Sequence, residues 1–263
     1  MTATEQYEKN LRVLDRRYPY LFSRVKYTGW EGILTGERYV ALPVAGGVAL
    51  SIGDGADTYA LVSQVNPQQQ AVRFVRSFFN ETTDVFICFG LAAGWYLTEL
   101  LHRMAEHQKV VVLEPDAELF MAHLRHIPLE HILADRRIFL MVDNSTDRAG
   151  NMLRYILWKY ATQRLSFGFF PSYANRFCRY AEEIKKILIE ESAAVRHNEK
   201  DFITSCQTIR ELYFNEEDMM GDLAAFFERI EAMQAQRPLT DIEQSYLFTK
   251  MLFFYKSYTE CSA

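Results

Sequence analysis

Residues 85–96 read Val85-Phe-Ile-Cys-Phe-Gly-Leu-Ala-Ala-Gly-Trp-Tyr96, and they indicate a Rossmann-type α/β fold. The first five residues are continuously apolar, which is typical of a parallel strand buried on both faces. Gly90 and Gly94 follow, and an amphipathic helix is predicted directly after them, over residues 97–105. A turn from strand to helix needs glycine where φ is positive or where the backbone approaches a ligand closely.

The same alternation continues toward the C-terminus. Further apolar strands are predicted at residues 110–113 and 138–142, with helices at 116–124 and 146–160. Residues 166–170 are a candidate fourth strand. Strands that alternate with helices predict a Rossmann-like parallel sheet flanked by helices.

The segments on either side of this pattern have a different character. Residues 4–18 predict a helix that Pro19 ends, and two β-prone runs around Ala45-Gly46-Gly47 predict a hairpin, with residues 58–62 as a candidate third strand. The chain from residue 173 predicts helices only, over residues 173–213, 218–234 and 241–258.

We therefore expect three parts. They are an N-terminal helix with a small β-rich subdomain (1–65), a Rossmann-like α/β domain (66–172) and a helical C-terminal region (173–263).

Composition narrows the class of protein. The 263 residues carry a net charge of -5 and no basic block, which argues against nucleic acid as the main partner. No stretch approaches the ~20 apolar residues that a membrane span needs, and the charged N-terminus is unlike a signal peptide. The four cysteines, none in a CxxC pair, indicate reduced thiols and a cytoplasmic protein.

The turn also predicts a nucleotide site. The free N–H groups of a helix N-terminus bind polar or anionic groups, and the acidic Glu114 at the next strand end suits two ribose hydroxyls, as in dinucleotide and S-adenosylmethionine sites. Candidate ligand-binding residues are Gly90, Ala92, Gly94, Glu114, Asp116 and Asp143. In the alternative interpretation the two glycines serve only tight packing and Glu114 pairs locally. Ala92 replaces the middle glycine of the usual motif, which limits close approach of a ligand.

Other polar residues favour structural roles. Asp116 is a plausible N-cap of its helix, and Asp143-Asn144-Ser145 is interpreted first as an N-cap and second as a contact to a base or sugar. His123, His126 and His131 are interpreted as surface histidines rather than metal ligands, and no catalytic residue is identified.

A dense aromatic zone precedes the helical region. We expect it to be core plus a domain interface, with a partner surface or a sugar-stacking platform as the alternative. Its members are Trp158, Tyr160, Phe167, Phe169, Phe170, Tyr173 and Phe177.

Beyond these patterns, the chain resembles a known family. The segments that carry the resemblance are residues 85–101, Val111-Val-Leu-Glu-Pro-Asp-Ala-Glu-Leu-Phe, Asn10-Leu-Arg-Val-Leu and Tyr18-Pro19. They resemble the N-terminal domain of the bacterial motility-associated factor glycosyltransferases. The resemblance covers roughly residues 4–200, and only Gly90, Gly94 and Glu114 match its central motif.

The resemblance implies a role in flagellin glycosylation. Members are thought to transfer nonulosonic acids, such as pseudaminic or legionaminic acid, from a CMP-activated donor to Ser or Thr of flagellin. Their transferase site is held to lie in a separate central domain with a Gly-Pro-Ser-Leu type loop, which this sequence does not contain. The chain thus resembles a freestanding N-terminal domain or a truncated member, with flagellin or a companion transferase domain as the implied partner.

Three functional hypotheses follow. The first is an auxiliary module of flagellin glycosylation that binds a ligand, such as a CMP-nonulosonic acid, or a partner. The second is an S-adenosylmethionine-dependent methyltransferase-like protein. The third is a non-catalytic interaction protein with a vestigial nucleotide fold, and fold analogy does not decide among the three.

Overall fold

The computed structural model describes residues 3–27, 29–34, 38–54, 57–160, 163–197, 232 and 235–238. These residues belong to two compact units. Among the described residues, the first unit comprises those of Met1–Ala149 and Gln163–Glu183. The second comprises those of Gly150–Thr162 and Ile184–Tyr258. All contacts of the candidate site below lie within the first unit. The three-part division drawn from the sequence stays a prediction.

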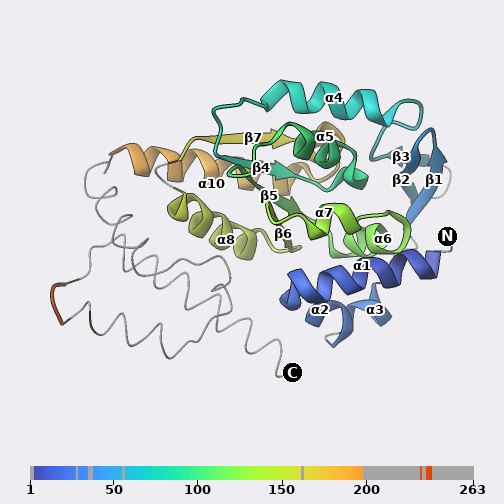
Figure 1. The fold of residues 1–263 in the computed structure, drawn as a ribbon, viewed down its shortest axis with the longest axis horizontal. Helices are drawn as coiled ribbons and strands as arrows, with labels where there is room; N and C mark the ends of the chain where they lie inside the picture. The colour runs from blue at the N-terminus through green and yellow to red at the C-terminus, as the bar shows by residue number, and fades with distance from the viewer. Residues whose placement is uncertain are drawn as a thin grey trace. The chain divides into compact units, whose positions relative to one another are not determined.

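A parallel sheet of four strands organises the first unit (Figure 1). The strands are β4 (Val85–Phe89), β5 (Lys109–Glu114), β6 (Ile138–Val142) and β7 (Leu165–Phe169), in the order β6-β5-β4-β7. Because β5 and β6 are added on one side of β4 and β7 on the other, the strand order reverses at β4. Open α/β sheets bind ligands beyond the carboxyl ends of the strands at such a reversal, which is where the glycine turn lies.

Helices connect these strands, so the predicted α/β class is confirmed. Helix α4 (Pro67–Phe78) precedes β4. The elements between the strands are the 3-10 turn η1 (Ala92–Gly94), α5 (Trp95–Arg103), α6 (Ala117–His126), α7 (Glu130–Ala134) and α8 (Thr146–Lys159). After β7 follow α9 (Pro171–Arg176) and α10 (Cys178–His197). In its described part, the helical segment expected over 173–213 is thus interrupted at Phe177. The helices expected at 218–234 and 241–258 lie outside the described residues, apart from residue 232.

The N-terminal region holds more helix than the sequence pattern predicts. Helix α1 (Ala3–Arg17) ends before Pro19 as expected, but Pro19 then opens a second helix, α2 (Pro19–Lys26), and α3 (Trp30–Ile33) follows. Proline is tolerated in a first helical turn, where its missing N–H would have no partner within the helix. It therefore separates two helices here instead of ending helical structure.

The predicted hairpin and third strand form a small antiparallel sheet of β1 (Tyr39–Val44), β2 (Gly47–Asp54) and β3 (Asp57–Ala60), in the order β1-β2-β3. Val44 pairs with Gly47, so a two-residue turn joins the first two strands. Gly46 has a φ of 86° in that turn, which glycine adopts without strain. The small β-rich section expected near the N-terminus is confirmed.

Aromatic rings fill the core where α4, α5 and α9 meet. The Phe74 ring lies 5.1 Å from Tyr96 and 5.0 Å from Phe170, between ring centroids, and the Tyr96 and Phe170 rings stack. Tyr160, Phe170 and Tyr173 are buried, so the core interpretation of the aromatic zone is confirmed for these three residues. Phe167 differs, with 36% of its surface exposed.

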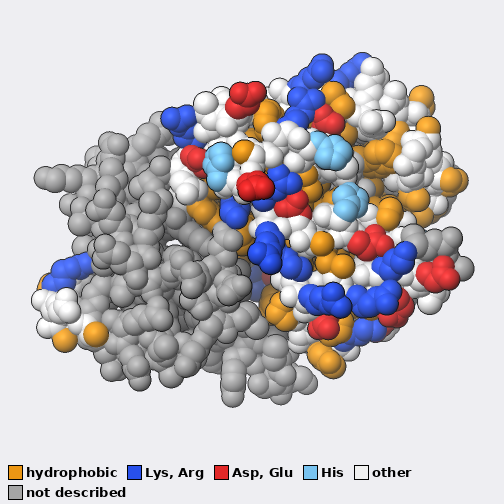
Figure 2. Space-filling view, in the orientation of Figure 1, with side chains coloured by type: hydrophobic (Ala, Val, Ile, Leu, Met, Phe, Trp, Pro, Cys, Tyr) orange, Lys and Arg blue, Asp and Glu red, His pale blue; other side chains and the backbone are white. Residues whose placement is uncertain are grey.

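On the face drawn in Figure 2, basic and acidic side chains are interspersed among apolar ones. None of the helices described by the structure combines the length and the apolar character required to cross a membrane.

Candidate functional site

The glycine turn between β4 and α5 has a left-handed backbone at several successive positions. The φ angle is positive at Gly90 (91°), Ala92 (47°), Ala93 (54°) and Gly94 (79°). This conformation costs an L-residue such as alanine about 1–2 kcal/mol. Surrounding contacts must therefore hold Ala92 and Ala93 in place.

Three consecutive backbone N–H groups of this turn donate to side chains from other elements. The donor–acceptor pairs are Leu91 with Glu114 Oε2 (3.0 Å), Ala92 with the Tyr173 hydroxyl (3.2 Å) and Ala93 with His123 Nε2 (3.1 Å). The acceptors come from β5, α9 and α6. In nucleotide-binding folds, N–H groups at this place bind the ligand; here they bind the protein's own side chains.

Side chains pack closely against both glycines of the turn. A Cβ added to Gly90 would overlap the ring of the buried Tyr173, and one added to Gly94 would lie 2.5 Å from the Ile132 Cδ1. The Tyr96 hydroxyl also donates to the Gly90 carbonyl at 2.6 Å. The Tyr173 ring therefore lies directly against Gly90.

Burial shifts the pKa values of two of these acceptors, Glu114 and His123, in opposite directions. Burial raises the pKa of Glu114 well above its ordinary value, even though the backbone N–H groups of Leu91 and Asp116 act in the opposite direction. Burial likewise lowers the pKa of His123 to about 4. Neutral His123 can donate from Nδ1 to the Leu119 carbonyl at 2.7 Å and accept at Nε2 from Ala93.

Asp116 caps α6, as predicted. Its Oδ1 accepts from the backbone N–H groups of Glu118 (2.8 Å) and Leu119 (3.1 Å). Its Oδ2 accepts from the Tyr39 hydroxyl at 2.7 Å and from the Arg38 guanidinium at 2.6 Å. The Asp116 carboxylate thus caps α6 through Oδ1 and joins it to Tyr39 of the small sheet through Oδ2.

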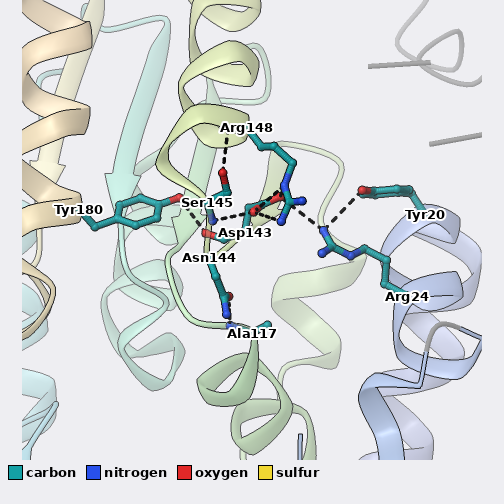
Figure 3. Close-up of polar contacts among 8 residues, drawn as sticks. All are labelled: Tyr20, Arg24, Ala117, Asp143, Asn144, Ser145, Arg148 and Tyr180. Carbon is teal, nitrogen blue, oxygen red and sulfur yellow. Dashed lines mark hydrogen bonds and ion pairs between the residues drawn. The ribbon is translucent and has the colours of Figure 1, made fainter. Parts of the chain in front are cut away.

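Asp143 lies beyond the end of β6 and faces two arginines (Figure 3). Arg148 from α8 makes three hydrogen bonds to its carboxylate, at 2.8–3.0 Å, and Arg24 from α2 approaches to 3.5 Å. Ser145 Oγ accepts weakly from the Arg148 N–H at 3.4 Å, which agrees with the interpretation of this segment as an N-cap. The structure thus brings Glu114 to the turn and joins Asp143 to α2 and α8.

The interpretation of the three histidines needs one correction. His123 is fully buried, not a surface residue, because α6 lies against α1 and presents His123 to the turn. His126 is half-buried and His131 is exposed, with its ring 2.9 Å from the Thr98 hydroxyl. Among the described residues, no group of three or more His, Cys, Asp or Glu side chains is placed to hold a metal ion.

The cysteines within the described residues are free thiols. Cys88 is buried in β4, where burial raises the pKa of its thiol, and Cys178 is exposed at the start of α10. Cys206 and Cys261 lie outside the described residues.

Sequence reasoning missed Tyr173 and His123 as contacts of the turn. A signal for His123 existed, since it lies four residues after Leu119 on the apolar face of α6. Tyr173 carried no comparable signal, because it is 81 residues from its partner Ala92.

Comparisons with known proteins give one distant similarity. No protein-family model matches the chain, and no curated protein matches it. The chain is similar to the solved structure of the MAf glycosyltransferase from Magnetospirillum magneticum AMB-1, with 12% sequence identity and a TM-score of 0.46. The match covers 70% of this chain and 35% of that chain, so it spans about a third of the solved protein's length.

Proposed function

We propose that this chain is an auxiliary, non-catalytic module of flagellin glycosylation that binds a protein partner and not a nucleotide. The observation that carries the proposal is the occupied turn, in which Glu114, Tyr173 and His123 accept the N–H groups that a nucleotide would use.

Displacing these acceptors is costly. Glu114 is 1% exposed, and its carboxylate also accepts from the Asp116 N–H at 3.4 Å. A ribose could reach Glu114 only if the Leu91 and Asp116 N–H groups lost their acceptor. Tyr173 would have to leave the aromatic core, and burying its ring stabilises the fold by roughly 1.5–3 kcal/mol.

The flagellin assignment rests on the sequence resemblance. The segment around Gly90, Gly94 and Glu114 resembles the N-terminal domain of motility-associated factor glycosyltransferases, whose transfer chemistry is held to lie in another domain. In this proposal, a companion transferase domain supplies the CMP-nonulosonic acid chemistry, and this module contacts flagellin.

A thermal-shift panel on the purified chain tests the nucleotide half of the proposal. The ligands are S-adenosylmethionine, S-adenosylhomocysteine, CMP, CTP and a CMP-nonulosonic acid, with AMP as a control. A ligand at about 100 times its Kd adds about 2.7 kcal/mol of stability, so binding is readily detected. We expect no shift.

A thermal shift with any of these ligands would contradict the proposal that the chain binds no nucleotide, and it would identify the class of ligand. A shift with the adenosyl compounds would support a methyltransferase-like protein, and one with cytidine compounds would place donor binding in this domain. Glu114→Gln then shows whether binding uses the turn, because binding that survives this change lies elsewhere.

A pull-down with purified flagellin tests the partner half. We expect the chain to retain flagellin but not an unrelated acidic secreted protein of similar size. Retention of neither, or of both equally, would overturn the flagellin assignment and leave the result of the nucleotide panel unaffected.

A further inference from the structure

Four exposed arginines come together where helix α1 ends beside the turn that precedes β6. Arg12, Arg16 and Arg17 lie in the last two turns of α1, and Arg136 lies in that turn. The Arg17 guanidinium donates to the carbonyl of Asp135, the residue before Arg136, at 3.5 Å, so the two elements adjoin here. Figure 2 shows several basic side chains over α1. These four arginines are called the basic patch below.

The basic patch lacks the carboxylate partners that other arginines of the same unit have. Arg38, Arg137 and Arg148 each pair with an aspartate, at distances of 2.6 Å, 2.7 Å and 2.8 Å. None of the four arginines of the patch forms an ion pair with a carboxylate among the described residues. Their guanidinium groups are therefore open to an external acceptor.

Helix stability accounts for only part of the patch. Basic residues in the last turn of a helix interact favourably with its macrodipole, which explains Arg16 and Arg17. Arg12 lies about one turn earlier and forms a like-charge i,i+4 pair with Arg16, and such pairs destabilise a helix. Arg136 belongs to another element. The gathered charge is thus unfavourable to the fold and favourable to an anionic ligand.

The spacing of the patch fits carboxylates on an extended chain. Guanidinium groups bind carboxylates through paired hydrogen bonds. Arg12 and Arg16 are separated by about 6 Å along the helix axis. Side chains on alternate residues of an extended peptide are separated by roughly 6–7 Å. Two such carboxylates can therefore meet the two arginines at once.

The charge of the whole chain favours a short acidic segment over a large anionic surface. The four arginines and Asp15, the one acidic residue among residues 9–17, sum to +4 − 1 = +3. The chain as a whole has a net charge of -5. A membrane or a nucleic acid would repel the acidic remainder of the chain, whereas a short segment meets the patch alone.

We propose that the basic patch binds an extended acidic segment of a protein partner. The inference goes beyond the proposed function, because it states the charge of the partner and holds whether or not that partner is flagellin.

An NMR titration of the full chain with a defined peptide tests the patch. The probe is an end-blocked peptide in which glutamate alternates with serine, and the control peptide carries glutamine in place of glutamate. At about 20 mM salt, we expect the glutamate peptide to shift the amide resonances of Arg12, Arg16, Arg17 and Arg136, with weaker binding at about 150 mM. Shifts centred elsewhere, an equal response to the glutamine peptide, or no response would overturn the proposal.

Paired substitutions test which arginines bind the peptide. Arg12→Gln with Arg16→Gln should raise the Kd about five-fold, as for the loss of two exposed ion pairs. Arg73→Gln with Arg76→Gln is the matched control, because these arginines are also exposed on one helix, α4, and form no ion pair with the described residues. Asp15→Asn removes the opposing charge and should lower the Kd about two-fold. Equal weakening by the two arginine pairs would overturn the proposal.

The same spectra show whether each variant is folded, and glutamine is a good helix former at these exposed positions. A flotation assay with phosphatidylserine vesicles then separates a protein partner from a membrane. We expect the chain to stay in solution at about 150 mM salt. Flotation that is abolished by Arg12→Gln with Arg16→Gln would assign the patch to a membrane surface and overturn the proposal.

Discussion

Gly90 and Gly94 look equivalent in the sequence, but their surroundings differ. A Cβ at Gly90 would meet the ring of Tyr173, which is fully buried and bonded to Ala92. A Cβ at Gly94 would meet the terminal methyl of Ile132, which can rotate away. The two positions share a positive φ, so the backbone strain of an alanine is similar in both.

We therefore expect Gly90→Ala to destabilise the protein by more than about 3 kcal/mol and Gly94→Ala by about 1–2 kcal/mol. Urea denaturation followed by circular dichroism measures both. Gly32→Ala is the control, because nothing lies within 4 Å of its added Cβ, and it should not destabilise the protein. Equal losses at Gly90 and Gly94 would show that the Tyr173 ring yields readily, against the packing described here.

At the scale of elements, one asparagine attaches α1 to the domain. Asn10 is fully buried, and its amide nitrogen donates to the carbonyls of Leu124 and Ile127 at 2.8 Å each. Its amide oxygen accepts from the Leu129 N–H at 3.1 Å. The side chain thus satisfies three backbone groups in the segment from the end of α6 to the start of α7.

Asn10→Ala would leave those three backbone groups buried without partners, at about 1–3 kcal/mol each. We expect a loss of at least about 3 kcal/mol in the free energy of unfolding. Asn66→Ala is the matched control, because the exposed Asn66 side chain makes one capping bond, to Gln69, and its loss should cost about 1 kcal/mol. A loss at Asn10 no larger than that at Asn66 would contradict this role.

For the whole molecule, two buried groups at the turn give opposite dependences of stability on pH. The folded pKa of His123 is lowered to about 4, so the folded state binds fewer protons than the unfolded state below pH 6.5, and stability falls as pH drops from 6.5 toward 4. The pKa of Glu114 is raised, so its contribution is full below about 4.5 and is lost as pH rises through the folded value.

Replacing one of the two groups should leave only the pH dependence of stability that the other group causes. The Glu114→Gln variant should lose up to about 3 kcal/mol of stability between pH 6.5 and 4, because only the His123 shift then acts. The unmodified chain should lose less over the same range. His123→Gln should lose stability as pH rises from 4.5. Urea unfolding midpoints across this pH range measure both, and parallel curves for all three proteins would contradict the assignment.

Local patterns in the sequence were enough to predict the α/β class, the parallel strands and the cap at Asp116. Continuous apolar runs such as 85–89 indicate strands buried on both faces, and an Asn or Asp before a helical run accepts the free N–H groups. The same patterns did not predict α2, because Pro19 both ends one helix and permits the start of another.

Neighbouring residues alone were enough to locate the glycine turn and to place Glu114 at the next strand end, because they set strand and helix periods and turn chemistry. The side chains that fill the turn depend instead on tertiary packing. Tyr173 and His123 reach it from 81 and 30 residues away, through the placement of β7 beside β4 and the packing of α6. Hydrogen bonds between distant residues follow from how the elements pack, and no local pattern of residues encodes them.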